Sequence, residues 1–376
     1  MLRNKKKIVV AGHICLDITP KFPANPNSNL SEILLPGKLV QMRDADVHTG
    51  GVVANTGLAL NLFGADVNLI GKIGQDEFGK LILNILSSHM DTQHMLVAND
   101  TNTSYTIVLS PPGMDRTFLH NPGANDTFTF EDLTMEAIRE ATLFHFGYPP
   151  LMKRMYENDG EQLIRMFKTV KSLGVATSLD MAAVDPHSQA GTADWETILR
   201  RVLPYVDIFV PSVEELCFMI DRERYRDWQQ RAGGRDIIEI LSITGDVKPL
   251  ADKLLEMGAQ VMLLKCGALG LYYRAARQDI FIEISIPDLC VPQWAELERF
   301  EESYIPDRVV SATGAGDTSI AAFLYAMLHG YSLKQSLQLA AATGASCVTA
   351  FDPLSGLMTI EELLKKIDGG WKKQKV

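Results

Sequence analysis

The chain has 376 residues, of which 46% are hydrophobic, and this is enough apolar material for one large α/β domain or two smaller ones. Its 36 lysines and arginines stand against 46 aspartates and glutamates, which gives a formal net charge of −10. The one basic block is RNKKK at residues 3–7, so the charge balance argues against nucleic acid or an anionic membrane as a partner.

The five cysteines are scattered along the sequence, and none forms a C-x-x-C pair: Cys15, Cys217, Cys266, Cys290 and Cys347. This pattern predicts neither a disulfide framework nor a zinc site. The N-terminal segment has a basic start, but Gly12 and His13 interrupt its apolar run and no small-residue cleavage site follows. No apolar segment approaches the roughly 18 residues that span a bilayer. We therefore expect a cytoplasmic protein whose chain begins with a strand.

From residue 8 onward, short apolar runs alternate with longer helical patterns. Strands are expected at 7–15, 66–74, 142–148, 174–180, 206–212 and 259–267, and helices at 53–64, 78–89 and 248–258. Such alternation is typical of right-handed βαβ units, and the uninterrupted apolar character of the strands indicates a sheet that is buried on both faces. The sequence therefore predicts an α/β fold with a doubly wound, mostly parallel sheet in three layers.

Two stretches break this pattern, at residues 37–48 and 104–120. Both are half polar, rich in β-forming residues and interrupted by turns, so they predict strands of a separate, partly exposed sheet. This sheet is either a lid over a binding site or an ordinary excursion at the edge of the main sheet. Residues 221–246 and 286–308 are polar and irregular, and we expect them to be surface insertions.

The stretch SATGAGDTSIAAF at residues 311–323 places two glycines and an aspartate in front of an apolar run. Gly314 and Gly316 permit a tight turn, so that the N–H groups of Ala315, Gly316 and Asp317 could converge on an anion such as phosphate. The apolar spacing that follows predicts a helix, which ends at Gly330. The alternative is a plain glycine-rich turn, in which Asp317 is a charge that suits the exposed N-terminus of the helix.

Polar residues also end several of the predicted strands. Asp17 closes the first strand, TGGVVAN opens a helix at residues 49–55, Asp180 ends another strand, and Glu215 follows DIFVPS. In an open α/β sheet, ligands bind beyond the carboxyl ends of the strands. Each of these residues also has a plain structural explanation, as a turn, a tight loop or a charge in the first turn of a helix.

Together, GGVVANTG…GKIGQDEFG near the N-terminus and ATGAGDTSIAAF near the C-terminus resemble the PfkB, or ribokinase-like, family of carbohydrate kinases. The resemblance extends over about residues 7–365. RTFLHNPGAN at 116–125 is similar to the lid-return segment of sugar kinases, and VPSVEEL at 210–216 stands where the family has P-N-x-x-E. The resemblance implies a single ribokinase-like kinase domain over residues 1–376, with a small β lid inserted at approximately 18–48 and 104–121.

The resemblance also implies a catalytic apparatus. Asp317 matches the family's catalytic base, and Gly314, Ala315 and Gly316 match the anion hole whose N–H groups stabilise the transferring phosphoryl group. Phosphoryl transfer depends mostly on positioning and charge neutralisation, which agrees with this assignment. Because Asp317 stands near a helix N-terminus, we expect its pKa to be low, so that it orients the acceptor hydroxyl and takes the proton late.

Asp17, Gly51 and Asn55 match positions that bind hydroxyls of the phosphate acceptor in relatives. Arg116 resembles a lid arginine that reaches the substrate in some sugar kinases, although a solvated arginine is an equal alternative.

Cofactor binding follows from the same resemblance. Glu215 matches the glutamate that organises Mg²⁺ near the phosphates, and a lone carboxylate with waters is usual for this ion. Residues 343–352, including Gly344 and Cys347, are expected along the adenine of ATP, with Gly267 nearby.

Four positions depart from the family pattern. Ser311 replaces an aspartate that helps bind a monovalent cation in several relatives, which weakens the expectation of potassium dependence. Ser212 replaces the asparagine of P-N-x-x-E. Cys15 and Val52 replace an asparagine and a lysine of ribokinase-type enzymes, so ribose is a weak candidate for the acceptor.

The sequence as a whole predicts a Mg²⁺- and ATP-dependent kinase that phosphorylates a hydroxyl of a sugar or sugar-like acceptor. A nucleoside kinase of the same fold and a non-catalytic sugar or nucleotide sensor are the alternatives. Because the lid often pairs across a dimer in relatives, a homodimer is expected.

Overall fold

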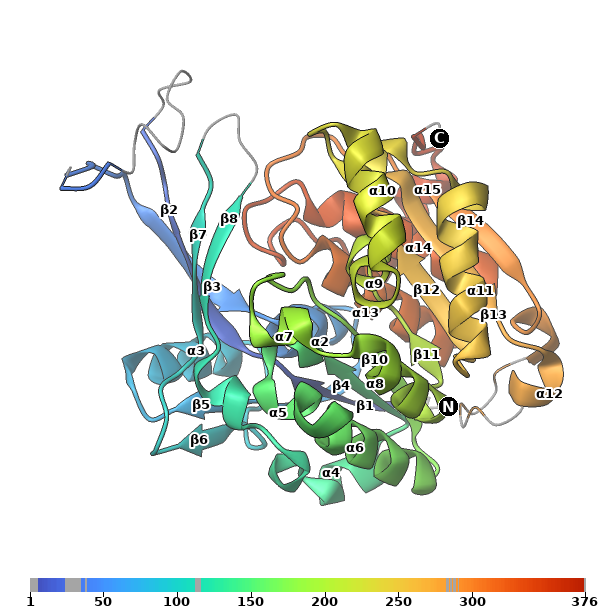
Figure 1. Cartoon of the computed structure of the whole chain (residues 1–376), viewed down its shortest axis with the longest axis horizontal. Coiled ribbons are helices and arrows are strands. Elements are labelled where there is room, and N and C mark those ends of the chain that lie inside the picture. The colour runs from blue at the N-terminus through green and yellow to red at the C-terminus, as the bar shows by residue number, and fades with distance from the viewer. Residues whose placement is uncertain are drawn as a thin grey trace.

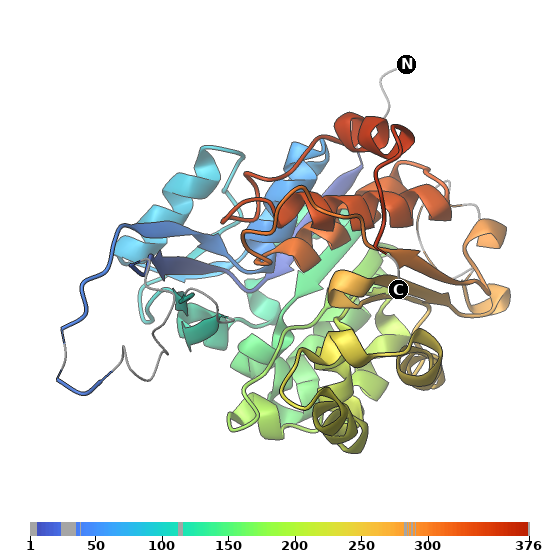
Figure 2. The ribbon, with the colours of Figure 1, turned by 90° about the horizontal axis from the view of Figure 1, so that it is seen from above.

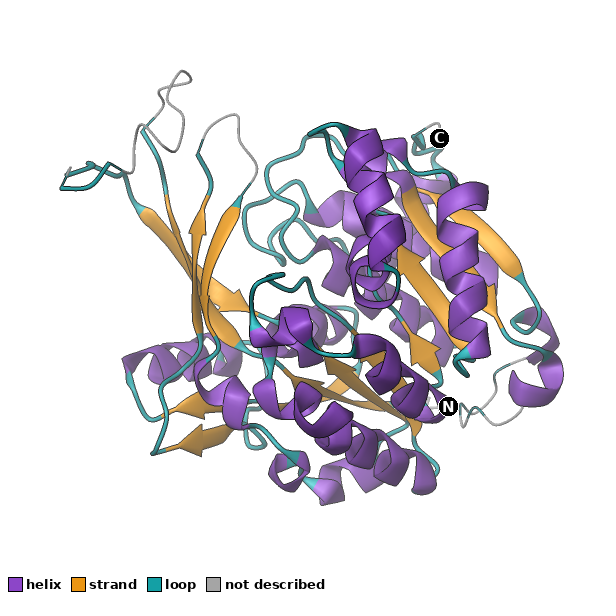
Figure 3. Cartoon of the chain, in the orientation of Figure 1, coloured by secondary structure: helices purple, strands orange, loops and turns teal. Residues whose placement is uncertain are grey.

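The computed structural model describes residues 6–23, 35–37, 39–111, 116–281, 284, 286, 289 and 291–374. Its centre is an eight-stranded sheet with the strand order β14–β13–β12–β11–β10–β9–β1–β4 (Figure 1 and Figure 3). The strands from β12 to β4 are parallel, and β13 and β14 join antiparallel at one edge. Their bounds are β1 Lys7–Gly12, β4 Asp66–Ile70, β9 Leu143–Gly147, β10 Ala176–Asp180, β11 Ile208–Phe209, β12 Val261–Lys265, β13 Gly270–Ala275 and β14 Glu298–Glu302.

Helices cover both faces of this sheet, which confirms the predicted three-layer α/β fold (Figure 2). Successive strand residues point to opposite faces, so Ile8 and Val10 pack in one core and Val9 and Ala11 in the other. The first face carries α2 Val52–Leu62, α3 Glu77–Ser87, α13 Ala315–Leu328, α14 Leu333–Cys347 and α15 Ile360–Asp368. The second face carries α4 Met135–Arg139, α5 Lys153–Tyr156, α6 Glu161–Ser172, α8 Trp195–Val202, α9 Val213–Ile220, α10 Arg222–Ala232 and α11 Lys248–Glu256.

Two short helices, α7 Gln189–Thr192 and α12 Gln278–Phe281, complete the α-helical part of the described chain. Within that part, no helix combines the length and apolar character that crossing a membrane would need. The four described cysteines are buried free thiols: Cys15, Cys217, Cys266 and Cys347. Cys290 lies outside the described residues.

A second sheet of four strands, in the order β3–β2–β7–β8, projects from one end of the central sheet (Figure 1). It consists of β2 Cys15–Pro20, β3 Ala45–Gly50, β7 Tyr105–Leu109 and β8 Thr117–Asn121. The separate sheet expected from residues 37–48 and 104–120 is therefore present, although parts of the expected lid, at 24–34, 38 and 112–115, lie outside the described residues. A two-stranded pair, β5 Lys72–Gly74 and β6 Leu96–Ala98, lies apart from both sheets.

The two faces of the four-stranded sheet differ in chemistry. Residues opposite each other in the register share a face, and one such row across β3, β2, β7 and β8 is apolar: Val47, Ile18, Ile107 and Leu119. The next row, on the other face, is polar: His48, Asp17, Thr106 and His120. Since His120 contacts His13 at the end of β1, the polar face is the one turned toward the central sheet.

Two predicted strands are each divided between sheets. Residues 7–15 form β1 and β2, and residues 66–74 form β4 and β5. The chain leaves the central sheet at residues 13 and 14 and again at residue 71. Both sheets bury apolar side chains, so hydrophobic periodicity does not mark the point at which the chain passes from one sheet to the other.

The expectation that residues 221–246 and 286–308 are irregular insertions is wrong in two places. Residues 222–232 form α10, in which Trp228 and Ala232 are the buried residues, so the apolar stripe is too sparse to reveal a helix. Residues 298–302 form β14, whose sequence ERFEE is charged because it lies at the edge of the sheet.

A close backbone contact at the ends of β1 and β9 positions the N-terminus of α2. Gly12 has a φ of 124°, and a Cβ there would lie 2.4 Å from the carbonyl oxygen of Gly147. A Cβ at Gly147 would in turn lie 2.6 Å from Cγ2 of Val52, the first residue of α2. The absence of side chains at both glycines therefore lets α2 begin directly above the strand ends.

We expect Gly12→Ala to lower the free energy of unfolding by about 3 kcal/mol, because the new methyl group would strain the backbone and clash with Gly147. Gly330→Ala is the matched control, since Gly330 also has a positive φ of 75° but open space around it. The control should cost about 1 kcal/mol. Urea unfolding followed by circular dichroism measures both, and equal losses in the two variants would contradict the close-contact argument.

Candidate active site

The glycine-rich loop, residues 311–314, leads into α13 beside the carboxyl ends of the central strands. Gly314 has a φ of 73°, and a Cβ there would lie 2.5 Å from Cβ of Pro353, so the turn requires glycine. The N–H of Ala315 donates to the carbonyl oxygen of Ala312 at 3.3 Å. The next N–H groups of the first turn, those of Gly316 and Asp317, have no acceptor within the helix. The N–H groups of Gly316 and Asp317 are therefore better placed to bind an anion in the predicted anion hole than the N–H of Ala315, which is already bonded to Ala312.

Asp317 lies in the first turn of α13 and is 3% exposed. Its Oδ2 accepts a hydrogen bond from Nδ2 of Asn55 at 2.9 Å, and the hydroxyl of Tyr148 lies 2.8 Å from Oδ1 and 2.7 Å from Oδ2. The alternative in which Asp317 is a charge at an exposed helix N-terminus is therefore wrong, because α13 is buried between α2, α14 and the sheet. Burial raises the pKa of Asp317, contrary to the expected low value, although Lys265, Asn55 and Tyr148 act to lower it.

A buried ion pair lies beside the start of α13. Lys265 at the end of β12 places Nζ 2.8 and 3.0 Å from the two carboxylate oxygens of Asp180 at the end of β10. A Cβ at Gly316 would lie 3.3 Å from Cδ and 3.5 Å from Nζ of Lys265. Burial opposes the charge of Lys265, but Asp180, Glu215 and Asp317 together raise its pKa. A positive charge is therefore held next to the predicted anion hole.

Glu215 stands in the first turn of α9 and forms a capping box with Ser212. The Ser212 hydroxyl accepts the Glu215 N–H at 3.4 Å, and Glu215 Oε2 accepts the Ser212 N–H at 3.2 Å. A β-bridge between Ser212 and Lys265 brings this cap next to the ion pair. In the described part of the chain, no cluster of three or more His, Cys, Asp or Glu side chains could hold a metal. Mg²⁺ bound at Glu215 would therefore take its other ligands from phosphates and water.

The residues predicted along the adenine have different surroundings. Gly267 follows β12 on the exposed surface. Gly344 lies in α14, and a Cβ there would be 2.6 Å from Oγ of Ser319, so it permits α14 to pack closely on α13. Cys347 is completely buried, with Sγ 3.6 Å from the carbonyl oxygen of Thr313. Gly344 thus supports the packing of α13 and Cys347 contacts the glycine-rich loop, and the contact of both residues with adenine stays a prediction.

The polar row of the four-stranded sheet surrounds Asp17. Cys15 donates from Sγ to Oδ1 of Asp17 at 3.2 Å, and Nε2 of His48 lies 3.9 Å from Oδ2. The hydroxyl of Thr106 lies 3.1 Å from Nδ1 of His120. Burial raises the pKa of Asp17, although His48 lowers it. The two histidines were not predicted; alternation along β3 is a signal that could have identified His48, whereas Phe118 and Leu119 precede His120 on β8 without alternation.

This polar row continues toward Asp317 through His13. Nε2 of His13 lies 3.4 Å from Nε2 of His120, and the rings of His13 and Tyr148 are 5.8 Å apart. A Cβ at Gly51 would lie 2.6 Å from Nδ1 of His13. Burial lowers the pKa of His120 to about 4 and that of His13 well below its usual value, so both imidazoles are neutral at pH 7. Asp17, Thr106, His120 and His13 therefore form one polar wall that leads to Asp317. Gly51 and Asn55 border this wall.

Arg116 lies at the start of β8 and donates from Nη1 to Oγ1 of Thr313 in the glycine-rich loop. Oγ of Ser311 lies 3.0 Å from the same Thr313 hydroxyl. Ser311 thus helps to order the loop. Arg116 lies where the four-stranded sheet meets this loop, and its contact with an acceptor stays a prediction.

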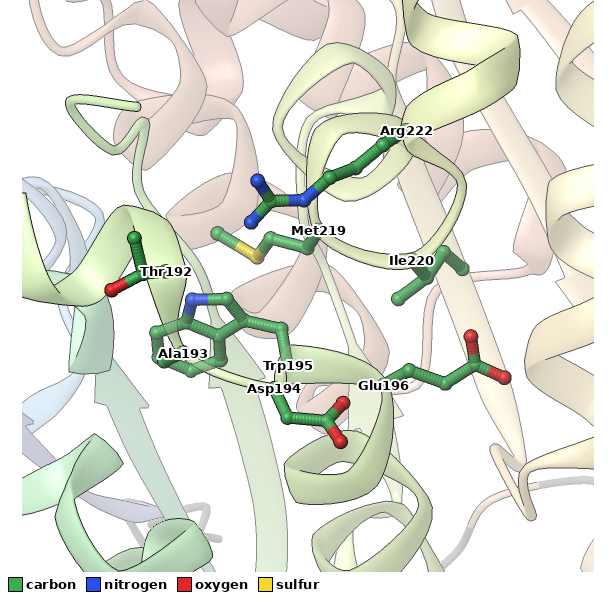
Figure 4. Close-up of a pocket in the computed structure, with 8 residues that line it drawn as sticks. All are labelled: Thr192, Ala193, Asp194, Trp195, Glu196, Met219, Ile220 and Arg222. Atoms are coloured by element: carbon green, nitrogen blue, oxygen red, sulfur yellow. The ribbon is translucent and has the colours of Figure 1, made fainter. Parts of the chain in front are cut away.

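Two surface cavities differ in their relation to these residues. A cavity of about 480 Å³ lies at the C-terminal end of α9, away from Glu215 in its first turn; Figure 4 shows its lining by Thr192, Ala193, Asp194, Trp195, Glu196, Met219, Ile220 and Arg222. None of the predicted site residues lines it. A second cavity of about 540 Å³ lies between β3 and the loops around residues 308–310 and 349–355, and includes His48 of the polar row.

Residues 5–359 match the pfkB family of carbohydrate kinases, and the chain therefore belongs to this family, as the resemblance in the sequence indicated. Among curated relatives, it is 23% identical to an uncharacterized sugar kinase of Archaeoglobus fulgidus, with 80% of this chain and 98% of the relative aligned. It is 25% identical to a probable fructokinase-5 of Arabidopsis thaliana, with 82% of this chain and 85% of the relative aligned.

Solved structures show the same fold. Arabidopsis thaliana ribokinase complexed with ribose and ATP superimposes with a TM-score of 0.69 at 20% identity, over 96% of this chain and 98% of the other. Xylella fastidiosa fructokinase with bound ATP gives 0.71 at 18% identity, over 97% and 99%. A nucleoside kinase of Burkholderia thailandensis in complex with inosine gives 0.66 at 16% identity, over 98% and 100%.

We expect Lys265→Met to destabilise the fold by about 1 kcal/mol more near pH 9 than near pH 6, because protonation limits the cost of leaving the Asp180 carboxyl group buried without its cation. Burial already raises the pKa of Asp180 to about 8, and loss of the lysine raises it further. A group whose pKa is raised on folding favours the native state as the pH falls. The loss should therefore be smaller at pH 6 than at pH 9.

Denaturant unfolding at the two pH values measures this difference. Lys80→Met is the control, because Lys80 forms an exposed ion pair with Glu77 at 2.6 Å and should change stability little at either pH. An equal loss for Lys265→Met at pH 6 and pH 9 would contradict the assignment of the uncompensated charge to Asp180.

Proposed function

We propose that this protein is a cytoplasmic, ATP-dependent kinase that transfers the γ-phosphoryl group to a hydroxyl of a sugar or sugar-like acceptor, with Asp317 as the base. The observation that carries this proposal is the arrangement around Asp317. The carboxylate is buried at the start of α13, is bonded to Asn55 and Tyr148, and stands at the end of the polar wall. An acceptor hydroxyl and a phosphoryl group can therefore meet beside it.

The proton of the attacking hydroxyl passes to Asp317 as the new O–P bond forms and the bond from the γ-phosphorus to the leaving oxygen of ADP breaks. A raised pKa suits this role, since it brings the proton affinity of the carboxylate closer to that of a working general base. The N–H groups of Gly316 and Asp317 and the ammonium of Lys265 stabilise the charge on the transferring group. Glu215 would hold Mg²⁺, which neutralises phosphate charge when bound.

The acceptor is proposed to bind along the polar wall, where carboxylate, hydroxyl and neutral imidazole groups suit the hydroxyls of an uncharged sugar. Asp17 contributes the carboxylate, Thr106 the hydroxyl, and His13 and His120 the imidazoles. A nucleoside is the second candidate, because the adjacent rings of His13, His120 and Tyr148 could stack against a base. A non-catalytic sensor would bind these ligands without turnover.

We further propose that the chain is one kinase domain in which the sheet β3–β2–β7–β8 acts as the lid. Closing a lid over the acceptor excludes water, which would otherwise compete for the phosphoryl group. The apolar row on the opposite face supports the expected homodimer, since Val47 is 43% and Leu119 is 50% exposed. A second copy of this sheet would cover that row.

Asp317→Asn tests the base directly. We expect the variant to lose at least about a thousandfold in turnover, because the amide cannot accept the hydroxyl proton, while ATP affinity changes little. Release of ADP from Mg²⁺-ATP is measured with ketoses, aldoses, sugar acids and nucleosides as acceptors. Turnover with a sugar that disappears in the variant supports the proposal, whereas turnover equal to wild type refutes Asp317 as the base. Ligand-induced stabilisation without any turnover supports the sensor.

Glu215→Gln tests the metal assignment. Glutamine can still complete the capping box with Ser212, so the variant removes charge while it preserves the helix start. We expect the Mg²⁺ concentration that gives half-maximal turnover to rise roughly tenfold. A Mg²⁺ titration at saturating ATP measures this value, and an unchanged midpoint would count against Glu215.

A further inference from the structure

The backbone at Tyr148 has an unusual conformation. Its φ of 67° and ψ of 39° lie in the left-handed region, which residues other than glycine rarely adopt. Such strain persists where surrounding contacts hold it, and it is concentrated at functional sites. Tyr148 follows β9 directly and precedes Pro149, and its N–H donates to the carbonyl oxygen of Asp180 at 3.3 Å. The strained turn thus lies within the proposed site.

The side chain of Tyr148 contacts the carboxylate of Asp317. Its hydroxyl lies 2.8 and 2.7 Å from the two oxygens of Asp317, while Asn55 donates to Oδ2 alone. Oδ1 therefore has the phenol as its side-chain donor among the contacts of the described residues. Burial raises the pKa of Tyr148 well above its usual value, and the negative charge of Asp317 adds to this effect. The phenol is a protonated donor at any pH at which the enzyme would work.

We propose that Tyr148 is a positioning residue for phosphoryl transfer, whose hydroxyl holds the Asp317 carboxylate ionised and aligned with the acceptor. This inference rests on the proposed function of Asp317 as the base. The two donors, Asn55 and Tyr148, approach from α2 and from the end of β9 and so fix the carboxylate plane from two elements. The strained backbone at Tyr148 places the phenol beside the Asp317 carboxylate.

The charged groups around Asp317 set the direction of the expected effect. Lys265 on β12 and the two hydrogen-bond donors favour its ionised form, whereas burial and the carboxylate of Glu215 on α9 oppose it. Asp180 on β10 is paired with Lys265. Removing the phenol hydroxyl takes away one group that favours ionisation, so the pKa of Asp317 should rise.

Tyr148→Phe is the test variant, because it removes the hydroxyl and keeps the ring. We expect the titration of Asp317 to move up by roughly one pH unit. Carboxyl ¹³C NMR of aspartate-labelled protein measures this, with Asp317→Asn to assign the signal. Tyr331→Phe is the matched control, since Tyr331 lies beyond the opposite end of α13 and should leave the titration unchanged.

Turnover gives a second measurement on the same variants. Tyr148→Phe should move the acid limb of the kcat profile to higher pH, so that kcat is lowered on that limb and recovers at higher pH, while KM for ATP stays unchanged, because the acid limb follows the pKa of the base. An unchanged Asp317 titration in Tyr148→Phe overturns the inference whatever the activity. A shifted titration in a protein that phosphorylates none of the acceptors supports the positioning of Asp317 and refutes the proposed kinase function.

The wild-type protein decides the question if Tyr148→Phe does not fold. A phenol hydroxyl bonded to a carboxylate gives a downfield proton resonance that is protected from exchange, and tyrosine labelled at Cζ assigns it. We expect this resonance for Tyr148, with an upfield shift in Asp317→Asn, where the acceptor is no longer charged. Its absence in the wild type would overturn the inference.

Discussion

The hydrogen bond between Asn55 and Asp317 joins residues that are 262 positions apart, and the rest of the site depends on it. It requires the first turns of α2 and α13 to lie against each other above the strand ends, which the glycines at 12 and 147 make sterically feasible. The same packing takes Asp317 out of water. Because desolvation disfavours the charged carboxylate, this one arrangement accounts both for the position of the side chain and for its raised proton affinity.

Charge balance is the second determinant of the site. Lys265 is surrounded by the carboxylates of Asp180, Glu215 and Asp317, so these four groups together are negative when all are ionised. A nucleotide triphosphate would add to this negative charge. A divalent cation at Glu215 therefore has an electrostatic reason to accompany the nucleotide, quite apart from the family to which the chain belongs. Lys265 lies beside the N-terminus of α13, where the proposed function places the phosphoryl group.

The sequence was sufficient for the layers of the fold and for the family to which the chain belongs, because periodicity and two separated motifs are local signals. It did not reveal Tyr148 or Lys265. Tyr148 follows β9 and Lys265 ends β12, each as a single polar residue, and their roles depend on partners 169 and 85 positions away. The expectation of a low pKa for Asp317 was wrong for a related reason. The dipole of α13 can be inferred from the sequence, whereas the packing of α14 and α2 around α13 cannot. The sequence did not predict strand β14, because an edge strand does not require apolar alternation.

The opposite character of the two faces of the four-stranded sheet has a further consequence for how the chain tolerates change. A slip of one residue in the pairing of β2 would exchange the rows, so that Ile18 would face the central sheet and Asp17 would face outward. An insertion inside β2 should therefore invert the chemistry of the sheet, whereas an insertion in the connection before β3 would leave it intact. A change in length within this part of the molecule should accordingly be tolerated better in the connections between strands than inside the strands.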